Sequence, residues 1–164
     1  MCRLKPRRLW GTHGMMQRNS AEIRPAEKAD IPAIARLEKL CFSAPWSEKA
    51  LCETMSREET IFLVASIGEK ICGYVGCYYV LDEGYITNVA VDPEFRRGGI
   101  GRALIEKLSD KAAEKKLAFL TLEVRVSNSA AIALYERAGF ESVGRRPRFY
   151  SEPCEDAELM TLYI

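Results

Sequence analysis

The stretch "VDPEFRRGGIGRALIEKL", from Val91 to Leu108, holds three glycines and three arginines between a strand-like run and a helix-like run. The free backbone N–H groups and dipole at a helix N-terminus favour a phosphate group. Glycines let the backbone approach closely, because no Cβ intervenes, and arginines add bidentate donors. We therefore predict an anion-binding loop, and the alternative is a surface turn with solvated arginines. The loop residues are Arg96, Arg97, Gly98, Gly99, Ile100, Gly101 and Arg102.

Two common nucleotide-binding motifs do not match this loop. A nucleoside triphosphate loop requires a Gly-Lys pair followed by Ser or Thr, which is absent after these glycines. A dinucleotide fingerprint requires G-x-G-x-x-G, and Gly99-Ile100-Gly101 has no third glycine at that spacing. The loop therefore indicates a phosphate-containing ligand that is bound by a different motif.

Three further polar residues follow the loop. In "LTLEVRV" the apolar residues alternate, so Glu123 and Arg125 share the other face of a predicted strand. Glu123 could simply face solvent or pair with an arginine. Tyr135 shares a helical stripe with apolar residues and could be a core tyrosine, while Asn128 could be a helix cap.

The elements that position these residues alternate between helix-like and strand-like patterns. A short strand and a helix are predicted in 21–42, with Asp30 as N-cap, and a second helix in 44–55, with Ser47 as N-cap. Three β-rich runs then form a predicted antiparallel meander. The order fits a single α/β domain with a mixed, mostly antiparallel sheet and helices on both faces. The remaining predictions are strands at 60–68, 70–81, 84–92, 118–126, 140–150 and 157–164, and helices at 99–116 and 129–139.

Charge and composition limit the functional classes. Residues 1–17 carry four basic residues and no acid; the remaining 147 carry 20 basic and 23 acidic residues, a net charge of −3. A mildly acidic domain disfavours nucleic-acid binding, and no apolar run is long enough to span a membrane. We expect residues 1–17 to be a flexible basic leader, or to precede a natural start at Met15 or Met16, and 18–164 to form the domain. The six cysteines include no CxxC pair and mostly lie in apolar runs, which indicates a reducing, cytoplasmic location and no metal site.

The spacing Arg96-x-x-Gly99-x-Gly101 resembles the R/Q-x-x-G-x-G/A loop of the GCN5-related N-acetyltransferase (GNAT) superfamily. Together with "FSAPWSEKAL", "ITNVAVDPEFRRGGIGRALI" and "LEVRVSNSAAIALYERAGF", it is similar to the RimI-type branch, the ribosomal-protein alanine N-acetyltransferases. The resemblance covers about Ala21 to Ile164. It implies that the loop amides bind the pyrophosphate of acetyl-coenzyme A (acetyl-CoA) as co-substrate, and that two central strands splay apart, with a bulge near Asn88.

The resemblance also implies a role for individual residues. Glu123 matches the general base of the family, and Tyr135 matches the acid that protonates the coenzyme A thiolate. Asn128 matches an asparagine that contacts the cofactor. The backbone of Val89, Ala90 and Val91 matches the strand that pairs with the pantetheine arm. The only histidine, His13, lies in the leader, so a histidine base is not expected.

The implied activity is acetyl transfer to a protein N-terminal α-amine, with a small-subunit ribosomal protein beginning with alanine as the acceptor. An α-amine has a pKa of about 7.7–8.0, against about 10.4 for lysine, so it loses its proton more easily. Two alternatives stay open: acetylation of lysine side chains or small amines, and a non-catalytic acyl-CoA-binding module. The presence of both Glu123 and Tyr135 argues against the second.

Overall fold

The computed structural model describes residues 21–164, and the predicted leader at 1–17 lies outside this range. Strands and helices alternate along the chain as the periodicity predicts. Residues that separate them include Gly68, with a φ of 60°, and Ser47, whose side chain accepts a hydrogen bond from the Ala50 amide. The elements are β1 (Glu22–Pro25), η1 (Lys28–Asp30), α1 (Ile31–Cys41), α2 (Glu48–Met55), β2 (Thr60–Ile67), β3 (Lys70–Val80), β4 (Glu83–Val91), η2 (Pro93–Phe95), α3 (Ile100–Glu114), β5 (Phe119–Arg125), α4 (Ser129–Arg137), β6 (Glu141–Ser151) and β7 (Cys154–Tyr163).

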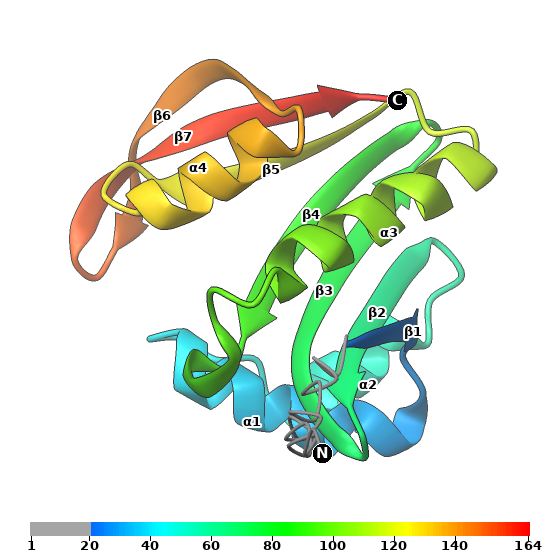
Figure 1. The fold of residues 1–164 in the computed structure, drawn as a ribbon. Coiled ribbons are helices and arrows are strands. Elements are labelled where there is room, and N and C mark those ends of the chain that lie inside the picture. The colour runs from blue at the N-terminus through cyan, green and yellow to red at the C-terminus, as the bar shows by residue number, and fades with distance from the viewer. Residues whose placement is uncertain (1–20) are drawn as a thin grey trace, which may run out of the picture.

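These strands form one seven-stranded sheet in the order β1-β2-β3-β4-β5-β7-β6 (Figure 1). The meander β2-β3-β4 is antiparallel, and the pair β4 and β5 is parallel. The connection between the parallel strands contains α3, as a crossover between parallel strands requires. The predicted α/β class and mixed sheet are confirmed.

Helices cover both faces of the sheet, and each face has its own apolar core. One core joins α3 and α4 to the sheet through residues such as Leu104, Leu108 and Leu122, each 3% exposed or less. The other joins α1 and α2 to the opposite face through residues such as Leu37 and Leu51, both fully buried. Hereafter these are the α3 face and the α1 face.

The parallel pair β4 and β5 is short. Its three residue pairs run from Glu83↔Phe119 to Tyr85↔Thr121, and beyond that the strands diverge, as Figure 1 shows. Gly76 of β3 pairs with Asn88 of β4, and the next β3 residue, Cys77, pairs with Ile86, so Thr87 is an extra, bulged residue of β4. A bulge bends its strand and redirects it. The predicted splay and the bulge beside Asn88 are both present.

Some details differ from the sequence analysis. The Asp30 side chain does not cap α1; it accepts hydrogen bonds from Arg24 and from the Glu27 amide instead. Of the five cysteines in residues 21–164, only Cys72 and Cys77 are buried, since apolar neighbours in sequence do not decide which face a residue occupies. Within the same range, no helix is long and apolar enough to cross a membrane, and no group of three or more metal-binding side chains occurs.

Asp30 offers a test of the packing around β1. Its carboxylate accepts from Arg24 Nη1 at 2.7 Å, Arg24 Nη2 at 2.9 Å and Glu27 N at 2.8 Å. The hydrogen bonds from Arg24 lower the pKa of Asp30. We expect Asp30→Asn to reduce the free energy of unfolding by about 1–2 kcal/mol at pH 7, since Arg24 is partly exposed.

The stabilisation by Asp30 is present above its unfolded pKa of about 3.9 and is lost as pH falls through the lower folded pKa. Urea unfolding at pH 7 and at successively lower pH should therefore show the difference between parent and variant shrinking toward acid. A difference that grows toward acid would contradict the assignment.

Candidate functional site

Glu123 and Tyr135 lie on opposite faces of the sheet. Leu122 and Val124 of β5 belong to the core of the α3 face, so the alternation of the strand places Glu123 on the α1 face. Tyr135, in the last turn of α4, belongs to the α3-face core. Both side chains can therefore reach one reacting centre only where the sheet is open, and the divergence of β4 from β5 provides such an opening.

The loop before α3 presents free donors. Gly99 has a φ of 83°, a left-handed conformation that suits glycine, and it precedes the first turn of α3. The first hydrogen bond of the helix runs from the Ala103 amide to the Gly99 carbonyl. Among residues 21–164, the backbone N–H groups of Gly99 through Arg102 have no acceptor. These free amides are the donors that the predicted anion-binding loop requires.

The three arginines of the loop have different surroundings. Arg96 Nε donates to the Val91 carbonyl at 3.0 Å, so this side chain folds back on the end of β4. Arg102 pairs with Glu106 one helical turn later at 2.7 Å. Arg97 has a φ of 65°, is exposed and forms no ion pair with any described residue. Arg97 is therefore the cation most readily available to an anion at this loop.

Gly101 allows α3 to approach α4 closely. A Cβ atom built on it would lie 3.1 Å from Leu134 Cδ2, tighter than ordinary packing. The glycine is therefore explained in part by helix packing, a role that the motif did not suggest. Asn128 shows a similar overlap, because its side chain caps α4 by accepting from the Ala131 amide at 3.2 Å.

The predicted pantetheine-binding strand presents alternate residues to the gap. Asp92 N donates to the Cys72 carbonyl of β3 at 2.8 Å. Because backbone groups of successive strand residues point to opposite edges, those of Ala90 also face β3. The backbone groups of Val89 and Val91 then face the gap, beyond the last β4–β5 pair. Since the Val91 carbonyl already accepts from Arg96 Nε, the groups left for a ligand are both backbone groups of Val89 and the amide of Val91.

The Glu123 carboxylate lies near the β6–β7 hairpin. Arg146 Nη1 is 3.4 Å from Glu123 Oε1, and the Glu123 side chain is 19% exposed. The Tyr150 hydroxyl donates to the Glu123 carbonyl at 3.2 Å. The Arg pairing that the sequence left open is thus observed, yet the carboxylate keeps access to solvent.

Arg125 holds this hairpin in place. Its guanidinium donates to the carbonyls of Glu152 at 2.9 Å and Pro153 at 3.0 Å, and it pairs with Glu155 at 3.1 Å. It also lies over the Tyr150 ring, 4.1 Å from the centroid. One side chain therefore connects the end of β5 to the turn and to the tyrosine beside Glu123.

Tyr135 is a largely buried residue whose hydroxyl is left without a partner. The residue is 7% exposed, and its ring centroid lies 5.6 Å from that of Phe140. Among residues 21–164 its hydroxyl has no hydrogen-bond partner, and no fully buried side-chain oxygen there is unpaired, so the Tyr135 oxygen is not completely buried. Burial raises the pKa of the phenol, which keeps it protonated at neutral pH.

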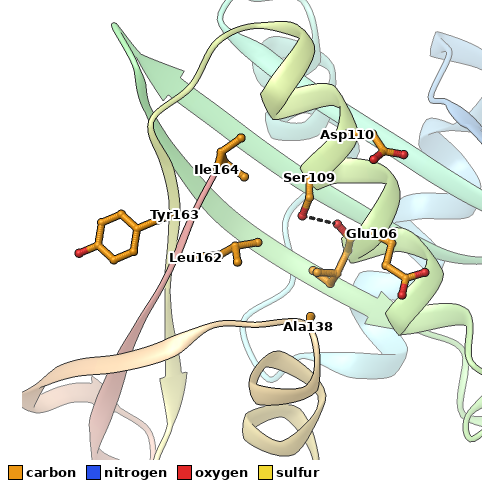
Figure 2. A pocket seen from close by; sticks show the side chains of 8 residues that line it. Glu106, Ser109, Asp110, Ala138, Leu162, Tyr163 and Ile164 are labelled. Carbon is orange, nitrogen blue, oxygen red and sulfur yellow. Dashed lines mark hydrogen bonds between the residues drawn. The ribbon is translucent and has the colours of Figure 1, made fainter.

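A hollow of about 360 Å³ lies elsewhere, between the second half of α3 and the end of β7 (Figure 2). It is wide open to solvent, and none of the predicted site residues lines it. We place the candidate site at the gap instead, because the predicted residues lie on the elements around it: Glu123 on β5, the free amides at the start of α3, and Tyr135 on α4, which packs against α3. The hollow is lined by Ile105, Glu106, Ser109, Asp110, Ala138, Leu162, Tyr163 and Ile164.

Sequence reasoning missed Arg146, Tyr150 and Glu38 as residues of this region. The first two come from a distant hairpin, and only pairing of β6 with β7 brings them to Glu123. The burial of Glu38 could have been predicted from the sequence, since it follows Ile34 by four residues and so falls within the apolar stripe of α1. It is fully buried.

Fold and loop together define an acyltransferase of a known kind. The model of the Acetyltransferase (GNAT) family matches residues 31–140, and the chain belongs to this family. The predicted resemblance is confirmed.

Individual relatives are more specific. A ribosomal protein bS18 alanine N-acetyltransferase of Escherichia coli K12 is 40% identical over 144 residues, which are 87% of this chain and 97% of that protein. The crystal structure of the ribosomal-protein-S18-alanine N-acetyltransferase from Escherichia coli superposes with a TM-score of 0.81 at 38% identity, covering 88% of this chain and 94% of that one. The NatC complex bound to Gag peptide and CoA contains a chain with a TM-score of 0.79 and 26% identity, covering 88% and 99%.

The role of Arg125 in holding the β6–β7 hairpin can be tested by replacing its guanidinium, which carries several donors in one plane. We expect Arg125→Ala to lower the free energy of unfolding by about 1–3 kcal/mol, because the Glu155 carboxylate and two carbonyls lose their donor. Amide hydrogen exchange should also accelerate in the β6–β7 turn. Arg125→Lys should recover only part of the loss, because an ammonium cannot reproduce the planar fork. Full recovery by lysine would show that charge alone holds the hairpin.

Proposed function

We propose that the protein transfers an acetyl group from acetyl-CoA to the N-terminal α-amine of a ribosomal protein, one of the small subunit that begins with alanine. Membership of the GNAT family and the 40% identity to an alanine N-acetyltransferase support the reaction and the kind of acceptor. The single observation that carries the proposal is the opening between β4 and β5, with Glu123 on one face and Tyr135 on the other. A ribosomal acceptor implies a cytoplasmic enzyme.

Acetyl-CoA would bind along the α3 face. The amides of Gly99 through Arg102 would hold its pyrophosphate, since they have no acceptor among the described residues and lie at a helix N-terminus. Arg97 adds a positive charge, and Gly98 and Ile100 complete the loop. The backbone of Val89 and Val91 would pair with the pantetheine amides, which directs the thioester toward the opening.

Acetyl transfer forms a C–N bond and breaks a C–S bond. The amine must lose a proton, and the departing thiolate must gain one. Glu123 is placed to accept the amine proton, directly or through water, because the acceptor can approach from the α1 face while the donor occupies the other. Arg146 next to the carboxylate limits its motion.

Tyr135 acts on the sulfur. A coenzyme A thiol resembles a cysteine thiol, with a pKa of about 8.5 against about 10 for an ordinary phenol. Since burial raises the pKa of Tyr135 further, complete transfer of its proton to the thiolate is uphill. A hydrogen bond from the hydroxyl to the developing negative charge is therefore its main contribution, and the thiolate takes its proton from solvent once it has left.

Two other functions use the same site. Lysine side chains or small amines could be the acceptor, and the catalytic pair would serve them equally. A non-catalytic acyl-CoA-binding module would need the loop but neither Glu123 nor Tyr135.

The acceptor assignment is tested with peptides. A peptide that begins with alanine followed by arginine, and that also contains lysine, should be acetylated at its N-terminus, because the α-amine is more easily deprotonated. The same peptide with a blocked N-terminus should remain unlabelled. Tandem mass spectrometry locates the acetyl group; acetyl-lysine would support the lysine alternative, and binding of acetyl-CoA without transfer would support the binding module.

Substitutions of the two catalytic candidates should change the pH dependence of turnover in different ways. Glu123→Gln removes the base, so its activity should partly recover as pH rises through the α-amine pKa of about 7.7–8.0. Tyr135→Phe keeps the ring packing and should recover only near the thiol pKa of about 8.5. At pH 7 each variant should lose roughly 10²–10⁴-fold in turnover.

Turnover is measured from pH 6 to 10, with acetyl-CoA affinity determined by calorimetry as the control. Affinity should survive in both variants, since the loop is unchanged. A variant that keeps more than about half of the parent turnover at pH 7, with chemistry rate-limiting, is not in its assigned role.

A further inference from the structure

The α1 face next to the opening contains a buried carboxylate that the proposed chemistry does not use. Glu38 of α1 is fully buried, and no described basic side chain lies within ion-pair distance of it. Its oxygens accept from Trp46 N at 2.7 Å, from Asn88 Nδ2 at 3.0 Å and from the Tyr74 hydroxyl. Three donors from three separate parts of the chain therefore satisfy one buried carboxyl group.

Each donor belongs to a different part of the structure around the opening. Trp46 lies in the connection between α1 and α2, Tyr74 in β3, and Asn88 directly after the bulged Thr87 in β4. Burial and the nearby Glu38 raise the pKa of Tyr74, so its phenol stays protonated and continues to donate. The carboxylate thus fixes the α1–α2 connection against the strand that forms one side of the opening.

This network lies on the face and at the level of Glu123. Asn88 alternates with Val89, which packs in the α3-face core, and Ala90 belongs to the α1-face core, so Asn88 points to the α1 face. Thr87 and Glu123 each lie two residues beyond the last pair, Tyr85↔Thr121, on the two strands that border the opening. The acceptor amine must pass this level to meet Glu123.

We propose that Glu38 is a positioning residue for the acceptor: its carboxylate holds the α1–α2 connection and the β4 bulge as one wall of the acceptor entrance. This inference rests on the proposed function, because it assigns the α1 face to the acceptor. Glu38 does not contact the donor side, where Val89, Val91 and the loop before α3 lie. Loss of the carboxylate therefore weakens acceptor binding and leaves acetyl-CoA binding intact.

The main test compares Glu38→Ala with Glu38→Gln. Alanine leaves the Trp46 and Asn88 donors without their partner, and we expect the acceptor KM to rise by about tenfold or more. Glutamine can accept from Trp46 N and donate to the Tyr74 oxygen, so its KM should rise less. The dissociation constant of acetyl-CoA, measured by calorimetry, should stay within about twofold of the parent in both variants.

Asp30→Asn is the matched control. Asp30 is also a buried acid, 6% exposed, with hydrogen bonds to a side chain and an amide, but it lies at η1 rather than at the opening. The Asp30→Asn substitution should lower stability without changing the acceptor KM. If Asp30→Asn raises KM as much as Glu38→Ala, the effect is general destabilisation and the proposal fails.

A direct measurement of the α1–α2 connection uses Trp46. The chain has two tryptophans, so replacing Trp10 with phenylalanine in every protein leaves Trp46 as the reporter. Acrylamide should quench Trp46 more strongly in Glu38→Ala than in the parent, with Glu38→Gln between them. Unchanged quenching together with an acceptor KM within about twofold of the parent overturns the proposal.

Three further outcomes can be told apart by these measurements. If Glu38→Ala does not fold, Asn88→Ala removes a single donor from the network, and an acceptor KM raised by about threefold supports the proposal, while an unchanged KM refutes it. If the parent acetylates lysine instead of N-termini, the proposed function fails, and the KM comparison is made with that acceptor. A quenching change with an unchanged KM for every amine shows that Glu38 stabilises the connection without positioning the acceptor.

Discussion

β4 and β5 share only three residue pairs, and the rest of the site depends on their divergence. A continuous sheet would separate Glu123 from Tyr135, because they lie on opposite faces with the backbone between them. The bulge at Thr87 bends β4, and α3 and α4 pack against the diverging strands on one face. The opening lets a donor and an acceptor meet from opposite sides without competing for space.

The two faces of the sheet differ in the groups that they present beside the opening. On the α3 face, backbone groups are left free: the amides of Gly99 through Arg102 and, at the edge of β4, both groups of Val89 and the amide of Val91. The Val91 carbonyl accepts from Arg96 instead. Such groups suit a polar, extended ligand whose amides and phosphates can satisfy them. On the α1 face, two side chains hold neighbouring segments instead. Arg125 fixes the β6–β7 turn on one side of Glu123, and Glu38 fixes the α1–α2 connection on the other.

Several residues to which we assign a chemical role also have a structural one. Tyr135 packs its ring in the core, so the core restricts the orientation of the hydroxyl that we propose acts on the sulfur. Asn128 caps α4, and Gly101 permits the close contact between α3 and α4. Function and folding are therefore coupled at these positions, and a loss of activity on substitution needs a stability measurement beside it.

Much of this protein followed from its sequence, because local signals are encoded in short spacings. Helical periodicity predicted α3 and its buried Leu104 and Leu108, and alternation in "LTLEVRV" separated Glu123 from the core side of β5. The glycine spacing predicted free amides before α3, and the motifs indicated the family, which the comparisons confirm.

The tertiary structure decided what depends on contacts between distant segments. The ion pair of Arg146 with Glu123 requires the register of β6 on β7, and the network around Glu38 joins residues up to 50 positions apart. Asp30 was expected to cap α1, yet the nearby guanidinium of Arg24 offered its carboxylate stronger donors. A local pattern fixes which face a side chain occupies, but only the packing of strands and helices determines which partner it meets there.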